Sequence, residues 1–142
     1  NQDDEFHYRA KSMGKTIYLN PEIKSMYYPR STVHSLFKQY YQYGLFKPLV
    51  LRKVKSGLRW RHLVPSGFVA YFAMLILLHN NFLFYVPGIF YIFLALLYSI
   101  RKSGHFIVAL NMIMVFPVLH FAYGLGFIKG QITLWTGKKP SL

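Results

Sequence analysis

The sequence predicts an α/β fragment at the N-terminal end, followed by an all-α membrane region of two to three transmembrane helices. Charged residues are frequent over residues 1–62, whereas residues 63–128 contain only Arg101 and Lys102 apart from histidines. A soluble portion followed by apolar blocks explains this break. The 142 residues include no cysteine, which excludes a disulfide framework and a cysteine-ligated metal site.

The first predicted element is a short helix from Asp3 to Met13. Three of the four acidic residues of the chain, Asp3, Asp4 and Glu5, fall in its first turn. Carboxylates there accept hydrogen bonds from free backbone N–H groups and lie at the positive end of the helix dipole. Gly14 is expected to end the helix in a left-handed conformation. Composition alone therefore explains the acidic cluster as a well-capped helix start.

Two extended runs follow this helix. Thr16–Leu19 is rich in β-branched and aromatic residues and stops at Asn20-Pro21, which predicts a strand. Ile23–Tyr28 is a second extended candidate, because Pro29 restricts Tyr28 to extended geometry. A helix and two extended runs in about thirty residues indicate the edge of an α/β domain whose main sheet is absent from these residues.

A second helix is predicted from the Ser31-Thr32 cap to about Tyr43, just before Gly44. Its apolar residues recur at helical spacing, and Gln39 and Gln42 project from roughly the opposite side.

Residues 47–62 are predicted to form a basic interfacial helix. This segment has no acid, and apolar residues including Trp60 are interleaved with six cations: Lys47, Arg52, Lys53, Lys55, Arg59 and Arg61. Such a segment beside a membrane span is typical of a helix lying on anionic headgroups. Nucleic-acid binding also suits the net charge of +13, but the adjoining apolar blocks favour lipid.

Three apolar blocks and a polar tail complete the chain, at about 63–80, 82–100, 105–128 and 129–142. Cytoplasmic loops carry an excess of Lys and Arg, which places residues 47–61 and the 101–102 loop in the cytoplasm and the 79–81 turn outside. We therefore expect a protein of the inner (cytoplasmic) membrane whose N-terminal part faces the cytoplasm.

Several short motifs share their order and spacing with a known enzyme family. In sequence they are Gln2–Arg9, Gly14, Ile17–Leu19, Tyr28-Pro29-Arg30, Gln39–Lys47, Arg61–Pro65 and His120–Phe127. Together they resemble the C-terminal part of family 2 glycosyltransferases. More narrowly, they are similar to membrane-anchored bacterial enzymes that build exopolysaccharides such as succinoglycan.

The resemblance implies that residues 1–46 are the C-terminal part of a GT-A catalytic domain. The implied function is inverting transfer of a sugar from a nucleotide-sugar donor to a glycan or polyprenyl-linked acceptor in polysaccharide biosynthesis. The implied cofactor is a divalent cation (Mg or Mn). The donor-binding sheet and the D-x-D metal ligands have no counterpart in these residues, so both are expected upstream of residue 1.

The resemblance also assigns roles to individual residues. The family's acidic pair is Glu-Asp, which carries the catalytic base onto Asp3 and leaves Gln2 at the Glu position. In the Q-x-x-[RQ]-[WY] element, Gln39 matches the Gln, while Gln42 and Tyr43 stand at the Arg and Trp positions. An acceptor hydroxyl is a very weak acid, so the reaction needs a carboxylate within hydrogen-bond reach.

Gln42 lacks the cation that would hold the diphosphate, and Arg9 or Arg30 is expected to compensate. Tyr43 keeps an aromatic face for stacking on a sugar. The resulting candidates are Asp3 as the catalytic residue, no metal ligand in these residues, and a substrate-binding set of Gln39, Gln42, Tyr43, Arg9 and Arg30.

Two other classes of function fit parts of the sequence. A small non-enzymatic membrane anchor or assembly subunit would explain the basic cytoplasmic collar and would tolerate Asp3→Asn. A transporter fragment is less consistent, because the apolar blocks contain no acid and their polar candidates are His79, Asn111 and His120.

We expect the isolated 142-residue chain to be inactive and to bind no nucleotide sugar, because the resemblance places the donor site upstream. Calorimetric titration of the isolated chain with nucleotide sugars measures this directly. Micromolar binding would contradict the assignment.

Overall fold

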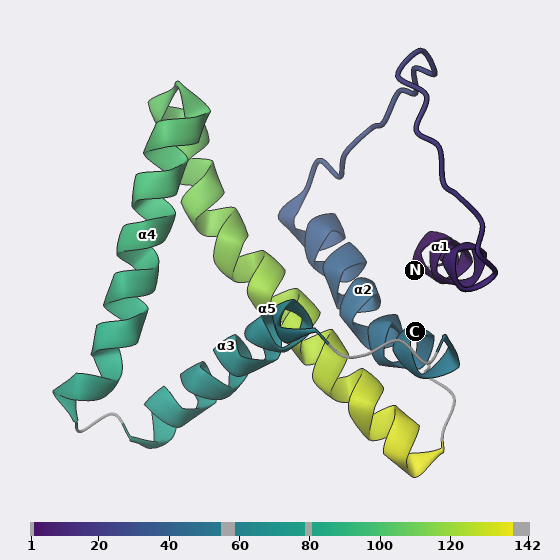
Figure 1. Ribbon diagram of the computed structural model, residues 1–142. Coiled ribbons are helices and arrows are strands. Elements are labelled where there is room, and N and C mark those ends of the chain that lie inside the picture. Colours follow the sequence, from purple (N-terminus) through teal and green to yellow (C-terminus); the bar gives the residue numbers. More distant parts are fainter. Residues whose placement is uncertain (1, 55–58, 79–80, 138–142) are drawn as a thin grey trace.

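The computed structural model of the chain describes residues 2–54, 59–78 and 81–137, and the regular elements in these ranges are all helices (Figure 1). In chain order they are α1 (Gln2–Ser12), α2 (Val33–Lys53), α3 (Trp60–Leu77), the 3₁₀-helix η1 (Phe82–Tyr85), α4 (Val86–Ser103) and α5 (Phe106–Thr136).

The α/β prediction for the N-terminal part is wrong, since the described residues contain no β-strand. The runs Thr16–Leu19 and Ile23–Tyr28 have no regular secondary structure and form the long connection between α1 and α2 (Figure 1), which is called the extended connection below. A strand is stabilised by hydrogen bonds to a neighbouring strand, and the described part of the chain offers neither run such a partner. Their side chains are instead exposed, with Leu19 88% and Tyr28 79% accessible.

The ends of the first two helices follow the local signals in the sequence. Gly14 lies just after α1 with φ +71°, in the left-handed region that favours glycine. Thr32 is the N-cap of α2, where its hydroxyl accepts a hydrogen bond from the backbone N–H of Ser35 at 3.2 Å. These caps fix where the extended connection begins and ends.

α2 continues through its predicted end at Tyr43 and runs to Lys53. The expected boundary between residues 46 and 47 therefore lies inside this helix. The segment 47–62 comprises the last turns of α2 and the first turn of α3, with residues 55–58 outside the described ranges. Gly44 and Pro48 do not end the helix, and both are buried within it.

The most extensive helix–helix contact joins α2 to the C-terminal half of α5, and the two helices run in the same direction (Figure 1). A Cβ atom added to Gly44 would lie 2.8 Å from the backbone nitrogen of Phe127, and one added to Gly126 would lie 2.9 Å from that of Leu45. The backbones can approach this closely because buried small residues recur every fourth position along α5, at Ala122, Gly126 and Gly130.

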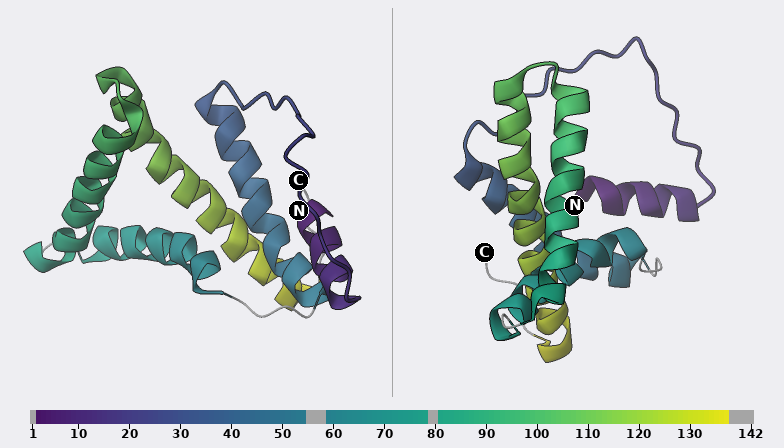
Figure 2. Two further views of the ribbon diagram at one scale, coloured as in Figure 1. Left: turned by 45° about the horizontal axis from the view of Figure 1, so that its top comes forward. Right: turned by 90° about the vertical axis from the view of Figure 1, so that its left-hand side faces the viewer.

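α3, α4 and the first half of α5 form three sides of a triangle (Figures 1 and 2). α4 and α5 make the hairpin at its apex, where Gly104 adopts φ +63° (Figure 2, right). The buried residues of this hairpin are small, namely Ala95, Ser99 and Ala109. Small side chains again let two helices pack closely.

Tyr71 ties α3 to the start of α4. Its hydroxyl donates a hydrogen bond to the backbone oxygen of Phe84 at 2.7 Å and accepts one from the N–H of Gly88 at 2.8 Å. These contacts satisfy backbone groups near the helix start, which have no partner within the helix itself.

Aromatic rings pack where α3 meets the middle of α5. The ring of Phe68 lies 4.9 Å from that of Tyr91, 5.2 Å from that of His120 and 5.1 Å from that of Phe121, measured between centroids. Gly124 also lies at this junction, and a Cβ there would overlap the backbone oxygen of Pro65.

Three helical segments are long and apolar enough to cross a membrane: Trp60–Leu77, Phe82–Ser103 and Phe106–Thr136. At most 11% of the residues in their most apolar windows are buried, so most of their apolar side chains face outward. A folded protein exposes this much hydrocarbon surface when lipid covers it. The chain is therefore a membrane protein.

Replacing Gly126 by alanine is expected to destabilise the protein. The new methyl group would overlap the backbone oxygen of Tyr41, so the helices must separate, at a cost on the order of 1–3 kcal/mol. Gly67→Ala in α3 is the matched control, because a Cβ there meets nothing within 4 Å. Thermal unfolding in detergent micelles compares the two variants. Equal stability would contradict the close contact.

Candidate functional site

The four helices α1, α2, α3 and α5 meet around a cleft of about 510 Å³. Its described lining residues combine one carboxylate, two cations, one imidazole, two phenols and a proline: Asp3, Tyr43, Lys47, Arg61, His62, Pro65 and Tyr123. This volume lies in the range of small-molecule sites. The cleft is the place where the predicted base meets a predicted sugar-binding residue.

α2 supplies Tyr43 and Lys47, which lie one helical turn apart. The amide of Gln39 donates a hydrogen bond to the Tyr43 hydroxyl at 2.7 Å, which orients the phenol. Lys47 is 8% exposed, and its ammonium lies 5.9 Å from the centre of the Tyr8 ring of α1. A cation in a partly desolvated position interacts strongly with an anion that enters the cleft.

α3 places Arg61 and His62 at the cleft through its first turn. The Nδ1 atom of the His62 ring accepts a hydrogen bond from the backbone N–H of Arg59 at 3.3 Å. In return, the backbone N–H of His62 donates a hydrogen bond to the backbone oxygen of Arg59 at 2.9 Å. These bonds fix the buried imidazole and leave the proton of its neutral form on Nε2. Arg61 lies beside it with an exposed side chain.

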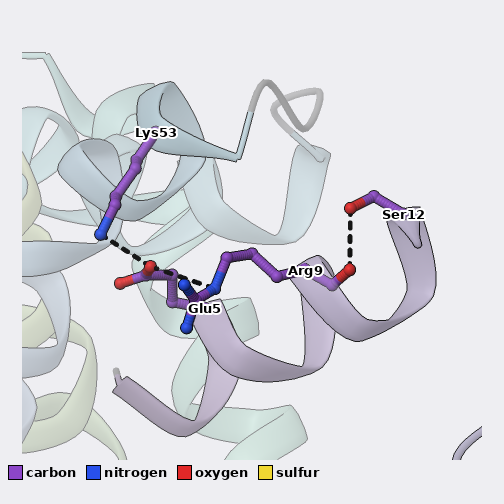
Figure 3. A network of polar contacts seen from close by, with 4 residues as sticks. All are labelled: Glu5, Arg9, Ser12 and Lys53. Atoms are coloured by element: carbon purple, nitrogen blue, oxygen red, sulfur yellow. Dashed lines mark hydrogen bonds and ion pairs between the residues drawn. The ribbon is translucent and has the colours of Figure 1, made fainter. Parts of the chain in front are cut away.

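α1 is held against the end of α2 by an ion pair (Figure 3). The Glu5 carboxylate lies 2.7 Å from the Lys53 ammonium and 3.6 Å from Nε of Arg9, and its side chain is 18% exposed. The hydrogen bond from Lys53, with the charges of Lys53 and Arg9, lowers the pKa of Glu5 below its ordinary value of 4.5. This pair positions the turn of α1 that carries Asp3.

The structure brings together part of the predicted site. Asp3 and Tyr43 line one cleft, and Gln39 reaches it through its bond to Tyr43. Gln42 is half-buried on α2 and is not among the lining residues.

The two predicted arginines lie elsewhere. Arg9 pairs with Glu5, and Arg30 is exposed in the extended connection between α1 and α2. The cations that line the cleft are Lys47 and Arg61, which the sequence pattern places in the basic interfacial segment 47–62. The sequence could have identified both residues as site candidates, because both lie in the motifs that carry the resemblance.

As far as its described residues go, the cleft does not resemble a divalent-metal site. One carboxylate occurs among the described lining residues, whereas Mg²⁺ and Mn²⁺ prefer several oxygen ligands. No group of three or more His, Asp or Glu side chains suited to a metal ion occurs within the described residues. A carboxylate beside two cations is better suited to a ligand that has both a hydroxyl group and a phosphate group.

Comparison with known proteins relates the chain to one enzyme class. No protein-family model matches it, and no solved structure matches it. A curated relative from Methanococcus voltae is 30% identical over 132 residues, or 93% of this chain. That relative is dolichyl N-acetyl-alpha-D-glucosaminyl phosphate 3-beta-D-2,3-diacetamido-2,3-dideoxy-beta-D-glucuronosyltransferase, and the chain spans about 40% of its length. The chain is thus similar to a glycosyltransferase over most of its residues.

Acidification is expected to release α1 from α2. Because the pKa of Glu5 is lowered by Lys53, the pair stabilises docking above pH 4.5 and is lost as the pH falls through the lowered pKa. The chain has no cysteine, so spin labels on Lys11→Cys and Arg52→Cys can report the distance between the helices.

The distance distribution should be narrow at pH 7 and broad near pH 3. Glu5→Gln should broaden it at both values, because an amide forms no ion pair. Glu22→Gln, in the extended connection, is the matched control and should behave as the parent protein does. A narrow distribution for Glu5→Gln at pH 7 would contradict this role of the ion pair.

Proposed function

We propose that this chain is part of a longer, membrane-bound glycosyltransferase that transfers a sugar to a lipid-linked acceptor. The observation that carries this proposal is the position of Asp3, in the wall of a cleft formed with two membrane-capable helices. The relative is named as a transferase acting on a dolichyl-linked sugar phosphate, which supports both the enzyme class and the acceptor class.

Asp3 acts as the general base in this proposal. An acceptor hydroxyl in the cleft gives its proton to the Asp3 carboxylate while its oxygen forms a bond to the donor's anomeric carbon. The bond from that carbon to the donor's phosphate oxygen breaks, and the phosphate leaves with the electron pair. A single displacement of this kind inverts the anomeric configuration. Asp3 is exposed in the cleft wall, where an acceptor can reach it.

The other lining residues bind substrate in this proposal. Tyr43 and Tyr123 offer aromatic faces to sugar rings, and Gln39 keeps the Tyr43 hydroxyl in place. Lys47 and Arg61 attract phosphate oxygens. Arg9 and Arg30 stay candidates for contacts with the donor, which we propose is a nucleotide sugar bound upstream.

A divalent cation, Mg or Mn, belongs to this proposal as a cofactor of the donor site. One carboxylate among the described lining residues does not suit it, so we place its ligands upstream of residue 1 and derive no step from it. We further propose family 2 membership, a role in polysaccharide biosynthesis, and a location in the inner membrane with the cleft facing the cytoplasm.

Asp3→Asn in the full-length enzyme is expected to lower the rate of sugar transfer about 10²- to 10⁴-fold, the usual contribution of a general base. Donor binding should be retained, because the amide removes the proton acceptor and changes little else. Radiolabelled sugar transfer to a lipid-linked acceptor measures the rate, and calorimetry measures donor binding.

Glu22→Gln provides the matched control for this substitution. Glu22 is exposed in the extended connection between α1 and α2, away from the lining of the cleft, so its loss should leave transfer unchanged. Normal transfer by the Asp3→Asn enzyme would remove the base assignment and favour the role of a membrane anchor.

A further inference from the structure

One face of α5 is left largely uncovered by the other described helices. α4 packs along the first half of α5 and α2 along the second half, on a different side (Figure 1). On the remaining face, exposed side chains recur at steps of four and three residues: Ile107, Asn111, Met114, Leu125, Ile128, Ile132 and Trp135. Val118 and Phe121, which are half-buried, occupy the two intervening steps. These nine positions form the α5 stripe.

The spacing of the α5 stripe is that of a helix which pairs with another helix. Steps of four and three residues average about 3.5 residues, so the stripe stays on one side of a slightly supercoiled helix. The stripe contains no charged residue. Lys129 lies beside it on α5, but its ammonium is directed to α2, where it lies 5.7 Å from the centre of the Tyr41 ring. The stripe therefore offers a partner an uncharged surface.

Asn111 is the amide of the stripe and lies in a membrane-capable segment. It follows Phe106 by five residues, which is about 7.5 Å along the helix, and its side chain is exposed. Its carboxamide makes no hydrogen bond within residues 2–54, 59–78 and 81–137. An amide that faces hydrocarbon without a partner costs free energy. We therefore expect a hydrogen-bonding partner for Asn111 outside these residues.

A bilayer is too thin to cover the whole stripe. α5 has 31 residues and is about 46 Å long, whereas the hydrocarbon core is about 30 Å thick. Even a tilt of about 40° leaves the helix spanning about 35 Å along the membrane normal. When the first half of α5 crosses the bilayer, Trp135, which is 84% exposed, extends beyond the hydrocarbon. A protein surface that reaches from lipid into water explains both ends of the stripe.

We propose that the α5 stripe is the interface of a homodimer, in which two copies of α5 pair across a two-fold axis. Copies of one membrane protein insert in the same orientation, so this axis lies along the membrane normal and the two helices run parallel. Each stripe then meets the same stripe in register, as in a parallel coiled coil.

The chemistry of Asn111 favours a second copy of the chain over lipid. A carboxamide carries both donors and an acceptor, so two Asn111 side chains related by the axis exchange hydrogen bonds with each other. A hydrocarbon chain offers neither group. The dimer does not depend on the proposed function, because none of its contacts involves the cleft carboxylate.

Disulfide cross-linking of the full-length protein in lipid vesicles tests the interface. The 142 residues contain no cysteine, and any cysteine outside them is replaced by serine. Single cysteines are then placed on the stripe, in turn at Ile107, Met114, Leu125 and Ile132. Each is expected to cross-link to the same residue of a second copy. Cross-linking at both ends of the stripe requires the two helices to run parallel.

Ile100→Cys is the matched control for Ile107→Cys. Both isoleucines lie near the hairpin turn at Gly104, and both are exposed, but Ile100 belongs to α4. The control should remain monomeric. Equal cross-linking at Ile100 and Ile107 would overturn the interface, and so would cross-linking confined to one half of the stripe.

Asn111→Leu removes the paired amide and leaves an apolar side chain that fits both lipid and the stripe. The dimer should weaken about 3- to 30-fold, as expected for an interhelical hydrogen bond in a membrane. Energy transfer between donor-labelled and acceptor-labelled copies, followed as added lipid dilutes the protein, measures the dissociation constant. Asn111→Gln keeps a carboxamide and should restore part of the affinity.

Tyr98→Phe is the matched control for the loss of a polar group. It removes a hydroxyl from an exposed position of α4 and keeps the ring beside Phe116, so it should dimerise as the parent protein does. Parent-like affinity of Asn111→Leu would overturn the amide pair. Energy transfer no higher than that of randomly mixed copies would overturn the dimer. Neither result touches the proposed function, because no sugar donor is present.

Discussion

The close approach of the α2 and α5 backbones is the constraint on which the cleft depends. Gly44, which permits this approach, directly follows the cleft residue Tyr43. Gly124, which follows Tyr123, lets α3 approach α5 in the same way, because it meets the backbone of Pro65, itself a lining residue. The helix contacts thus set the spacing of the three cleft walls that α2, α3 and α5 form. A change that separates these helices by one methyl group therefore also widens the cleft.

The fourth wall of the cleft, which α1 forms, is held in place in a different way. α1 is anchored by the Glu5–Lys53 pair and by the Lys47 ammonium beside the Tyr8 ring, contacts that depend on charge rather than on buried apolar area. Exposed ion pairs are worth little and weaken with salt. The helix that carries Asp3 is therefore the part of the site whose position responds most to pH and ionic strength.

Local signals in the sequence predicted the helices better than they predicted the sheet. Thr32 and Gly14 act within a few residues of themselves, and they cap helices as expected. Thr16–Leu19 has the composition of a strand, but a strand also needs a partner, which composition does not supply. The sequence pattern places Lys47 and Arg61 in a lipid-binding segment and does not predict that they meet at the cleft, because their convergence depends on how α3 crosses α5, a long-range property.

The length of α5 sets the depth at which the cleft lies. Eighteen residues separate Phe106 from Gly124, which is about 27 Å of helix and close to the roughly 30 Å hydrocarbon thickness of a bilayer. A hairpin that crosses the bilayer here has Arg101 and Lys102 at one surface and the cleft at the other, although the sequence predicted both basic groups on one side. The length of this hairpin then fixes the level of the cleft, with the Asp3 carboxylate in its wall, at one surface of the membrane.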